Sequence, residues 1–406
     1  MNLELLKYFK GDRIIWIILL LLSLMSLLIV YSSTSALAYR QASGNTLYYL
    51  IRQFFFLGIG IGVMLLMVNV IPVKIYAMLA NYLIYFSIAL LLLTVALKFA
   101  GVVKGSGRTL NFGPLSFQPS EIAKISLIIY AAKVLAVKQK TRKDLFVAFR
   151  KIMFFTTIVC GLIFLSNFST AALLFATIIA MMFVGRIPLR YLILVLTAGV
   201  MLVLFIYFTA DLVPDSYTRV HTIKGRIERY IHSFIHSETG SETGITQADY
   251  AKLAIYEGGI IFGKGPGHSD VSNYMAAAYN DFIFAIIVEE YGLIISTGLM
   301  FLYLILFFRG VVIVRRTTRT FPAFLVVGFI MLLVFQAMIN IGVSSGALPV
   351  TGQPLPWISL GGTSLIFTSI AFGCILSVSH QNQMNRKIQQ QPVQVNAPDE
   401  DYEMEK

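Results

Sequence analysis

The sequence predicts an all-α polytopic membrane protein, and three observations support that prediction. Of its 406 residues, 57% are hydrophobic and only 13% are charged. The mean hydropathy is +0.77, which is too apolar for a soluble chain of this length. Ten apolar runs are long enough, or nearly so, to cross a bilayer, which takes about 20 residues per helix. They lie at 14–33, 48–70, 75–97, 121–137, 152–166, 169–185, 190–210, 282–308, 322–345 and 363–380.

The basic residues orient these runs, because Lys and Arg in short loops stay on the cytoplasmic side. With the N-terminus inside, nineteen of the 32 basic residues fall in cytoplasmic segments, and the short outer loops hold five. Both termini are therefore expected in the cytoplasm. The net charge of +12 follows from this topology, so anionic membrane lipid is the expected partner and nucleic acid is not.

Residues 1–380 are expected to form one membrane domain, with a large extracytoplasmic loop at 211–280 between the seventh and eighth runs. Within that loop, apolar residues recur at helical spacing from Val220 to Ile235, while Lys224, Arg226 and Arg229 take the other face. This pattern predicts an amphipathic basic helix at the outer membrane surface. The polar tail at 381–406 is expected to be disordered.

Only residues 166–169 separate the fifth and sixth runs, so one re-entrant hairpin is an alternative to two spans. The first run is longer than the apolar core of a cleaved signal peptide, and we expect it to remain as the first helix.

Three carboxylates lie at the start of the eighth run, where an uncompensated charge in hydrocarbon costs several kcal/mol. Asp281 should sit at the outer membrane boundary; as an alternative to a functional role, it could N-cap the helix. For Glu289 and Glu290 we favour a structural ion pair, with Lys124 or Lys133 as partner.

The fourth run begins with a second polar group. Ser120 suits an N-cap and Glu121 suits the first helical turn. Neither explains Lys124, a cation one turn into the membrane. Lys124 is therefore expected either to pair with a buried carboxylate or to bind an anionic substrate group.

The segment 258–270, G-G-I-I-F-G-K-G-P-G-H-S-D, nearly matches a phosphate-binding loop. It lacks the Ser or Thr after Lys264 and faces outward, where no nucleotide pool exists. Its backbone amides could still hold a diphosphate, and a simple flexible turn is the alternative. His232 and His236 have a metal-binding spacing but lack a third ligand nearby.

The last outer loop, 340–364, is broken by Pro349, Pro354, Pro356 and several glycines. Irregular backbone at membrane depth is tolerated only where protein or a watery cavity surrounds it. We therefore expect a cavity that opens to the outer face.

Four motifs together resemble the SEDS family of bacterial cell-wall synthesis (FtsW, RodA and SpoVE proteins), and the resemblance covers nearly the whole chain. The motifs are G-R-T-L-N-F-G-P-L-S-F-Q-P-S-E-I-A-K at 107–124, G-G-I-I-F-G-K-G-P-G at 258–267, N-D-F-I-F-A-I-I-V-E-E-Y-G at 280–292, and N-I-G-V-S-S-G-A-L-P-V-T-G-Q-P-L-P-W-I-S-L-G-G-T-S at 340–364.

The resemblance implies a multi-pass protein of the bacterial cytoplasmic membrane that polymerises lipid II into β-1,4 glycan strands on the outer face. It also implies that Asp281 is the catalytic aspartate. The implied substrate-binding residues are Arg108, Gln118, Glu121, Lys124 and Lys264.

The chain departs from the family pattern in two places. Tyr279-Asn280 stands where His-Thr is usual, and Asn167-Phe168-Ser169-Thr170 stands where Pro-Asp-Leu-Gly-Thr is usual. No role of that histidine or of that aspartate is therefore transferred to this chain.

In this interpretation Asp281 is the general base for the attacking sugar hydroxyl, since a partly desolvated carboxylate is a stronger base than one in water. Arg108 and Lys124 would stabilise the departing diphosphate, together with a divalent cation such as Mg or Mn if one is used.

The Gly-rich final motif and the acidic tail resemble the division-type FtsW group more than the elongation-type RodA group. Either type implies a class B penicillin-binding protein as transpeptidase partner, alongside other divisome proteins. Two other functions stay open: a flippase for the lipid-linked precursor and a non-catalytic scaffold.

Overall fold

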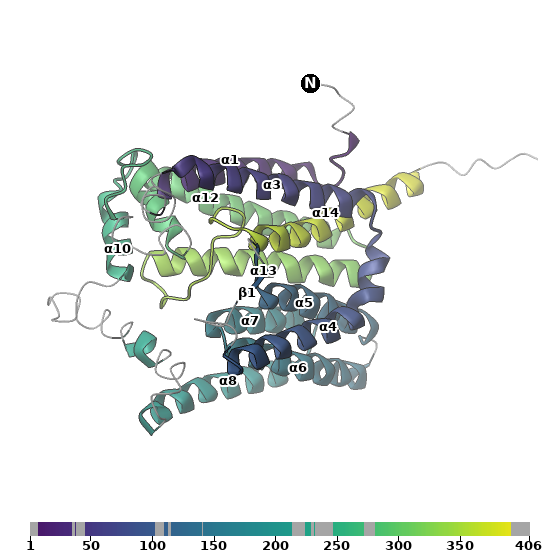
Figure 1. The fold of residues 1–406 in the computed structure, drawn as a ribbon. Coiled ribbons are helices and arrows are strands. Elements are labelled where there is room, and N and C mark those ends of the chain that lie inside the picture. The colour runs from purple at the N-terminus through teal and green to yellow at the C-terminus, as the bar shows by residue number, and fades with distance from the viewer. Residues whose placement is uncertain are drawn as a thin grey trace, which may run out of the picture.

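The fold is a bundle of long helices (Figure 1). The computed structural model describes residues 7–34, 37, 45–101, 109–112, 115–139, 141–212, 224–228, 231, 247–271 and 281–390. The long helices are α1 (Arg13–Ser33), α3 (Thr46–Asn69), α4 (Val73–Phe99), α5 (Pro119–Val137), α6 (Arg142–Phe164), α7 (Phe168–Val184), α8 (Leu189–Thr209), α12 (Ile283–Arg315), α13 (Thr320–Ser344) and α14 (Thr363–Gln390).

The helices form two groups that run along a common axis (Figure 1). One group contains α1, α3, α12, α13 and α14, and the other contains α4 to α8. Helix α13 joins the groups, because it packs against α12 and α14 on one side and against α5 and α7 on the other. The short helix α10 (Gln247–Glu257) lies at the left end in Figure 1, and α14 ends at the right.

The all-α membrane fold predicted from the sequence is confirmed. Among the described residues, eight helices are long and apolar enough to cross a membrane. The other two predicted spans coincide with α5, which contains Glu121, Lys124 and Lys133, and with α7, which has only 17 residues. The count of ten spans therefore stays a prediction.

The structure adds three features that the sequence analysis missed. Strands β1 (Leu110–Phe112) and β2 (Leu115–Phe117) form a small antiparallel hairpin, and α10 lies in the long outer loop. Helix α14 continues to Gln390, so the predicted disorder from residue 381 is wrong as far as 390. Of the amphipathic helix predicted from Val220 to Ile235, residues 224–228 are helical in the structure. Most of its other residues lie outside the described part of the chain.

Helix α12 is broken at Gly292, whose φ of 82° and ψ of 169° are not helical. The glycine-rich segment 258–265 packs into this break. Its amides donate to carbonyls of α12, with Lys264 N to Glu289 O at 2.8 Å and Gly265 N to Glu290 O at 3.0 Å. In return, Leu293 N donates to Gly259 O at 3.2 Å. The segment therefore satisfies peptide groups that the break exposes, as a low-dielectric surrounding requires.

The glycines of this segment are needed for close approach. A Cβ on Gly258 would lie 2.3 Å from the carbonyl oxygen of Val288, and one on Gly263 would lie 2.3 Å from the carbonyl carbon of Glu290. Because two of its amides bind α12, the segment is not a free turn, and Lys264 N and Gly265 N are not available to a diphosphate.

The loop between α13 and α14 is also held inside the protein. Tyr303 donates to Pro356 O at 2.5 Å, and Trp357, only 1% exposed, donates from its indole nitrogen to Ser23 Oγ at 2.8 Å. Ser26 Oγ donates to Ile358 O at 3.0 Å. Helices α1 and α12 thus surround this part of the irregular backbone with protein, which is one of the two surroundings that such backbone tolerates. The cavity open to the outer face stays a prediction.

Replacing Gly292 with Ala should destabilise the protein by about 1–3 kcal/mol, because this backbone conformation is nearly restricted to glycine. The new Cβ would also lie 2.8 Å from the carbonyl oxygen of Ile261. Thermal unfolding in detergent measures the effect. Gly298→Ala is the matched control, since that helical position has open space for a Cβ. Equal thermal unfolding midpoints for the Gly292→Ala and Gly298→Ala proteins would contradict the requirement for glycine at the break of α12.

Candidate functional site

Asp281 lies at the outer end of α12, half-buried. Phe282 is the N-cap residue of α12. Asp281 lies one residue earlier, so the alternative that Asp281 caps this helix is wrong. Its carboxylate faces the final outer loop, where a Cβ built on Gly352 would lie 3.3 Å from Asp281 Oδ2. Gly352 has a φ of +68°, so glycine there permits both the turn and the close approach.

An amide network holds the backbone around Asp281. The side-chain amide of Asn340, on α13, donates to Asp281 O at 3.1 Å and to Gln353 O at 2.8 Å. The side chain of Gln353 then donates to Thr170 Oγ1 on α7 at 2.9 Å. Asn340 and Gln353 therefore link three segments far apart in the sequence to the backbone of Asp281.

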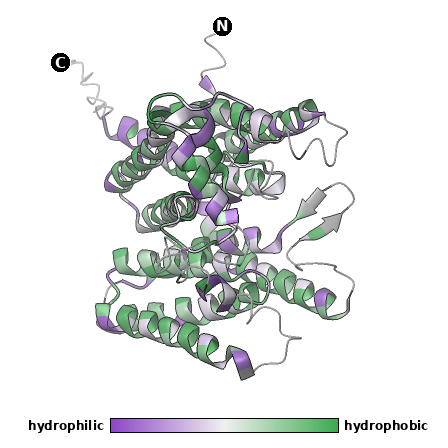
Figure 2. Cartoon of the chain, turned by 90° about the vertical axis from the view of Figure 1, so that its left-hand side faces the viewer, coloured by the Kyte–Doolittle hydropathy of each residue, from purple (hydrophilic) through white to green (hydrophobic). Residues whose placement is uncertain are grey.

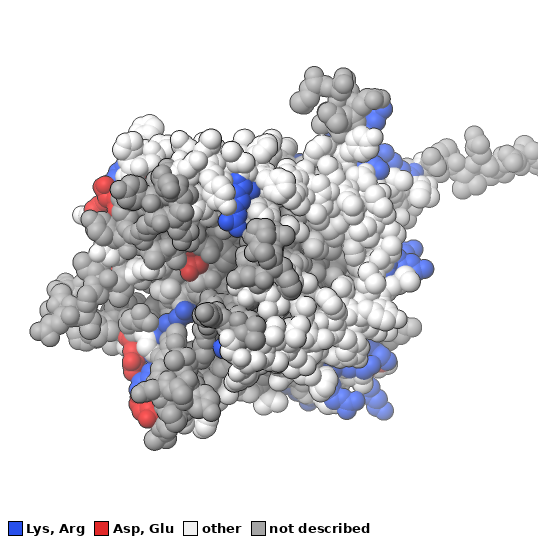
Figure 3. All heavy atoms as spheres, in the orientation of Figure 1, with Lys and Arg blue, Asp and Glu red and all other residues white. Residues whose placement is uncertain are grey.

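Buried polar atoms without a protein partner lie in the same region. Within the described part of the chain, Asn340 Oδ1, Ser344 Oγ and Thr351 Oγ1 are buried and make no hydrogen bond. Buried polar groups are normally paired, so these atoms are suited to bind water or a polar ligand. Figure 3 shows a hollow between the two helix groups with an acidic group inside it. In the end view of Figure 2, hydrophilic residues gather between the helices.

The outer loop reaches this region as well. Arg226, in the helical stretch 224–228, donates from Nη1 to Val350 O at 3.2 Å, two residues before Gly352. The sequence placed Arg226 on a face toward lipid headgroups and did not predict this contact.

The predicted residues of α5 form a local ion pair. Lys124 Nζ lies 2.9 Å from Glu121 Oε1, and the Lys124 side chain is only 4% exposed. Gln118 is the N-cap residue of α5, without a capping hydrogen bond from its side chain. Arg108 lies outside the described residues, as do His232 and His236.

The partner predicted for Glu289 is wrong. Lys124 pairs with Glu121, and Lys133 donates to Asn81 Oδ1 at 3.2 Å. The partner is Lys264, whose Nζ lies 3.1 Å from Glu289 Oε1. Spacing along the chain could not reveal this pair, because it forms only when the glycine-rich segment packs into the break of α12.

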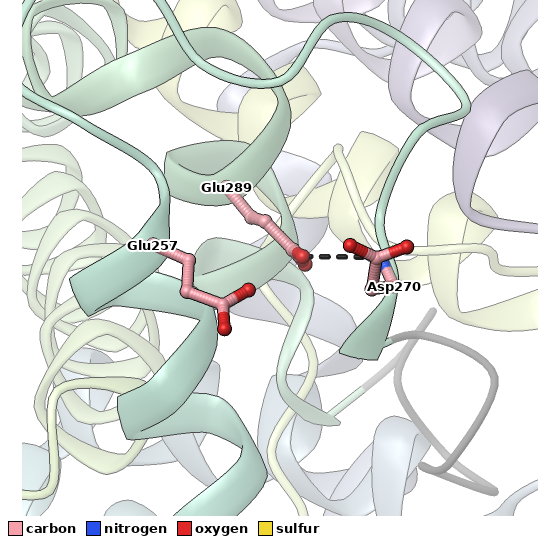
Figure 4. A group of neighbouring side chains, drawn as sticks. All are labelled: Glu257, Asp270 and Glu289. Atoms are coloured by element: carbon pink, nitrogen blue, oxygen red, sulfur yellow. Dashed lines mark hydrogen bonds between the residues drawn. The ribbon is translucent and has the colours of Figure 1, made fainter.

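Lys264 is surrounded by three carboxylates. It pairs with Glu257 at the end of α10, with Asp270 at 2.9 Å, and with the fully buried Glu289. Figure 4 shows these acidic side chains converging, with a hydrogen bond from Asp270 N to Glu289 Oε1. Hydrogen bonding to Glu257 raises the pKa of the Lys264 ammonium above its ordinary value, so the lysine stays charged at physiological pH.

The three carboxylates could also ligate a cation, since their oxygens lie within 4.8 Å of one another. The ammonium of Lys264 already contacts all three and supplies the positive charge. A divalent ion would therefore compete with Lys264 for this position. The substrate-binding role predicted for Lys264 stays a prediction.

Glu290 does not belong to the Lys264 cluster and is stabilised by other contacts. It accepts hydrogen bonds from Ser32 on α1 and from Gly267 N at 3.2 Å. The sequence suggested a lysine for this glutamate, whereas a hydroxyl and a backbone amide stabilise it.

Comparison with known proteins agrees with this architecture. A family model described as "Cell cycle protein" (FtsW/RodA/SpoVE) matches residues 12–384. The chain belongs to the FtsW/RodA/SpoVE family. The family predicted from the sequence is confirmed, and the chain is an integral membrane protein.

Relatives within the FtsW/RodA/SpoVE family span nearly the whole chain. It is 31% identical to the "Probable peptidoglycan glycosyltransferase FtsW" of Coxiella burnetii, over 91% of this chain and 96% of that one. It is 32% identical to "Stage V sporulation protein E" of Bacillus subtilis, over 92% and 98% of the two chains.

Solved structures resemble this member of the FtsW/RodA/SpoVE family too. One is a chain of a peptidoglycan synthase complex, with a TM-score of 0.69 and 25% identity over 92% of this chain and 98% of that one. Another is the rod shape determining protein RodA of Thermus thermophilus, with a TM-score of 0.60 and 24% identity over 90% and 96%. The second likeness shows the fold alone.

Replacing Lys264 with Met should destabilise the protein by about 1–3 kcal/mol, because it leaves the buried Glu289 carboxylate without its cation. Chemical or thermal unfolding measures this loss. In the double variant with Glu289→Gln, the combined loss should be smaller than the sum of the two single losses. A Lys264→Met protein of unchanged stability that binds lipid II more weakly would instead support the substrate-binding role.

Proposed function

We propose that this protein is a peptidoglycan glycosyltransferase that polymerises lipid II on the outer face of the cytoplasmic membrane. The observation that supports it most directly is the half-buried Asp281, whose carboxylate lies at the outer end of α12 beside Gly352 of the final outer loop. Relatives that bear the name peptidoglycan glycosyltransferase match more than nine-tenths of the chain, which agrees with this assignment.

The chemistry requires a base at this place. The 4-hydroxyl oxygen of one sugar forms a bond to the anomeric carbon of another, and the bond from that carbon to undecaprenyl diphosphate breaks with inversion. The hydroxyl proton passes to Asp281, and the electron pair of the broken bond leaves with the diphosphate. A positioned base typically accelerates such a step by 10²–10⁴-fold.

The leaving diphosphate needs positive charge close by. We assign this task to Lys124 and Arg108, and we assign Gln118 and Glu121 to sugar or diphosphate binding. Lys124 is buried in α5, and its Nζ lies 2.9 Å from Glu121 Oε1. A divalent cation such as Mg or Mn is compatible with this scheme, and no step depends on it.

We further propose the division-type role, in septal wall synthesis with a class B penicillin-binding protein and other divisome proteins. The FtsW names of the relatives favour it. One solved neighbour is described as a complex that coordinates polymerisation and crosslinking, which supports a transpeptidase partner. The elongation-type role is the alternative.

Asp281→Asn should lower polymerisation of lipid II by at least 100-fold and leave lipid II binding intact, because the amide cannot accept the proton. The assay uses the purified full chain in detergent and measures glycan strands and bound lipid II. Glu228→Gln, which removes another outer carboxylate, is the control and should retain activity. Near-normal polymer from Asp281→Asn would refute the role of the base. If the wild-type protein forms no polymer in detergent but moves lipid II across vesicles, it is a transporter instead.

Gly352→Ala should reduce polymerisation about tenfold with lipid II binding nearly unchanged, because the methyl group would crowd the carboxylate of Asp281. Gly101→Ala is the matched control. Gly101 has a similar φ of +72°, yet a Cβ there meets no atom within 4 Å. Equal activities for the two variants would show that the approach of Gly352 to Asp281 does not matter for catalysis.

A further inference from the structure

A second cavity lies far from Asp281, between α4, α5 and α6, with a volume of about 570 Å³. Its lining combines basic side chains with apolar and aromatic ones. The basic set is Lys133, Lys138, Arg150 and Lys151, and the aromatic set includes Tyr85, Tyr130, Phe154 and Phe155.

Among the described residues, three of the four cations lack an acidic partner. Lys138 lies 3.7 Å from Asp144. In the same part of the chain, Lys133, Arg150 and Lys151 make no ion pair, and Lys133 donates a hydrogen bond to the neutral Asn81. Cations brought together without carboxylates repel one another, so an anion in the cavity would stabilise them.

The cavity lies at the end of the bundle that the basic residues assign to the cytoplasm. Lys133 is four residues before the end of α5, and Arg150 is eight residues after the start of α6. At 1.5 Å per residue, these side chains begin roughly 6–12 Å inside the helix ends, within reach of the lipid phosphates. Figure 3 shows basic side chains gathered at this end of the lower helix group.

The apolar part of the lining is open toward the lipid. Tyr85 is 62% exposed, Phe154 is 61% exposed and Val137 is 65% exposed. A purely aqueous anion would leave these groups uncovered, whereas an acyl chain would cover them.

We propose that this cavity binds an anionic phospholipid of the cytoplasmic leaflet. Lys133, Arg150 and Lys151 hold its phosphate, and its acyl chain lies along Tyr85, Val137 and Phe154. Basic pockets between membrane helices on the cytoplasmic side suit such headgroups. The lipid would bridge α4, α5 and α6, and α5 also carries the Glu121–Lys124 pair at its opposite end.

The test measures binding of dioleoyl phosphatidylglycerol to the purified full chain in an uncharged detergent by native mass spectrometry. The variant Lys133→Gln/Arg150→Gln/Lys151→Gln should bind it at least tenfold more weakly. Dioleoyl phosphatidylcholine should bind the wild-type protein at least tenfold more weakly than phosphatidylglycerol does. Excess inorganic phosphate should not displace the lipid.

Two control variants separate this site from general charge effects. Arg315→Gln/Arg316→Gln/Arg319→Gln removes the same charge from exposed cytoplasmic positions outside the cavity, and should bind within about threefold of the wild type. Lys133→Arg/Lys151→Arg keeps the charge and should also retain binding. The proposal fails if the two Gln variants lose binding equally, if both lipids bind alike, or if inorganic phosphate displaces the lipid.

Discussion

The fold depends on one constraint: peptide groups at membrane depth must find hydrogen-bond partners inside the protein. Helix α12 breaks at Gly292, and the break leaves carbonyl and amide groups without helical partners. The segment 258–265 supplies those partners, and its Lys264 then reaches the buried Glu289. Backbone pairing and charge neutralisation are thus achieved by the same short segment. This explains how Glu289 is tolerated inside an apolar helix. The neighbouring Glu290 is stabilised instead by Ser32 and by the amide of Gly267.

The peptide groups of the final outer loop, 340–364, also need hydrogen-bond partners inside the protein. The side chains of Tyr303, Ser26 and Asn340 donate hydrogen bonds to its carbonyl groups. The loop is therefore fixed against α1, α12 and α13, and Gly352 is held beside Asp281. A rigid surrounding of this kind lets a carboxylate keep one orientation toward a reacting hydroxyl, which is what general base catalysis requires.

Charge is distributed according to position in the bundle. Several carboxylates of the outer half are paired with a lysine, as in the Glu121–Lys124 pair and the Lys264 cluster. At the opposite end, the cavity between α4, α5 and α6 contains three cations without an acidic partner among the described residues. The outer end is thus arranged around internal pairs, and the cytoplasmic end is left to interact with anionic lipid.

The sequence by itself determined the membrane class and the approximate helices, because hydrophobic length is a local signal. It also singled out Asp281, whose catalytic role stays a proposal. It did not determine the partner of Glu289, the hairpin at 110–117, the helix α10 or the extension of α14 to Gln390. Nor did it indicate the amide network of Asn340 and Gln353. The Glu289–Lys264 pair and the amide network depend on contacts between segments separated by many residues. Only tertiary packing brings such segments together, so these contacts cannot be predicted from periodicity or spacing along the chain.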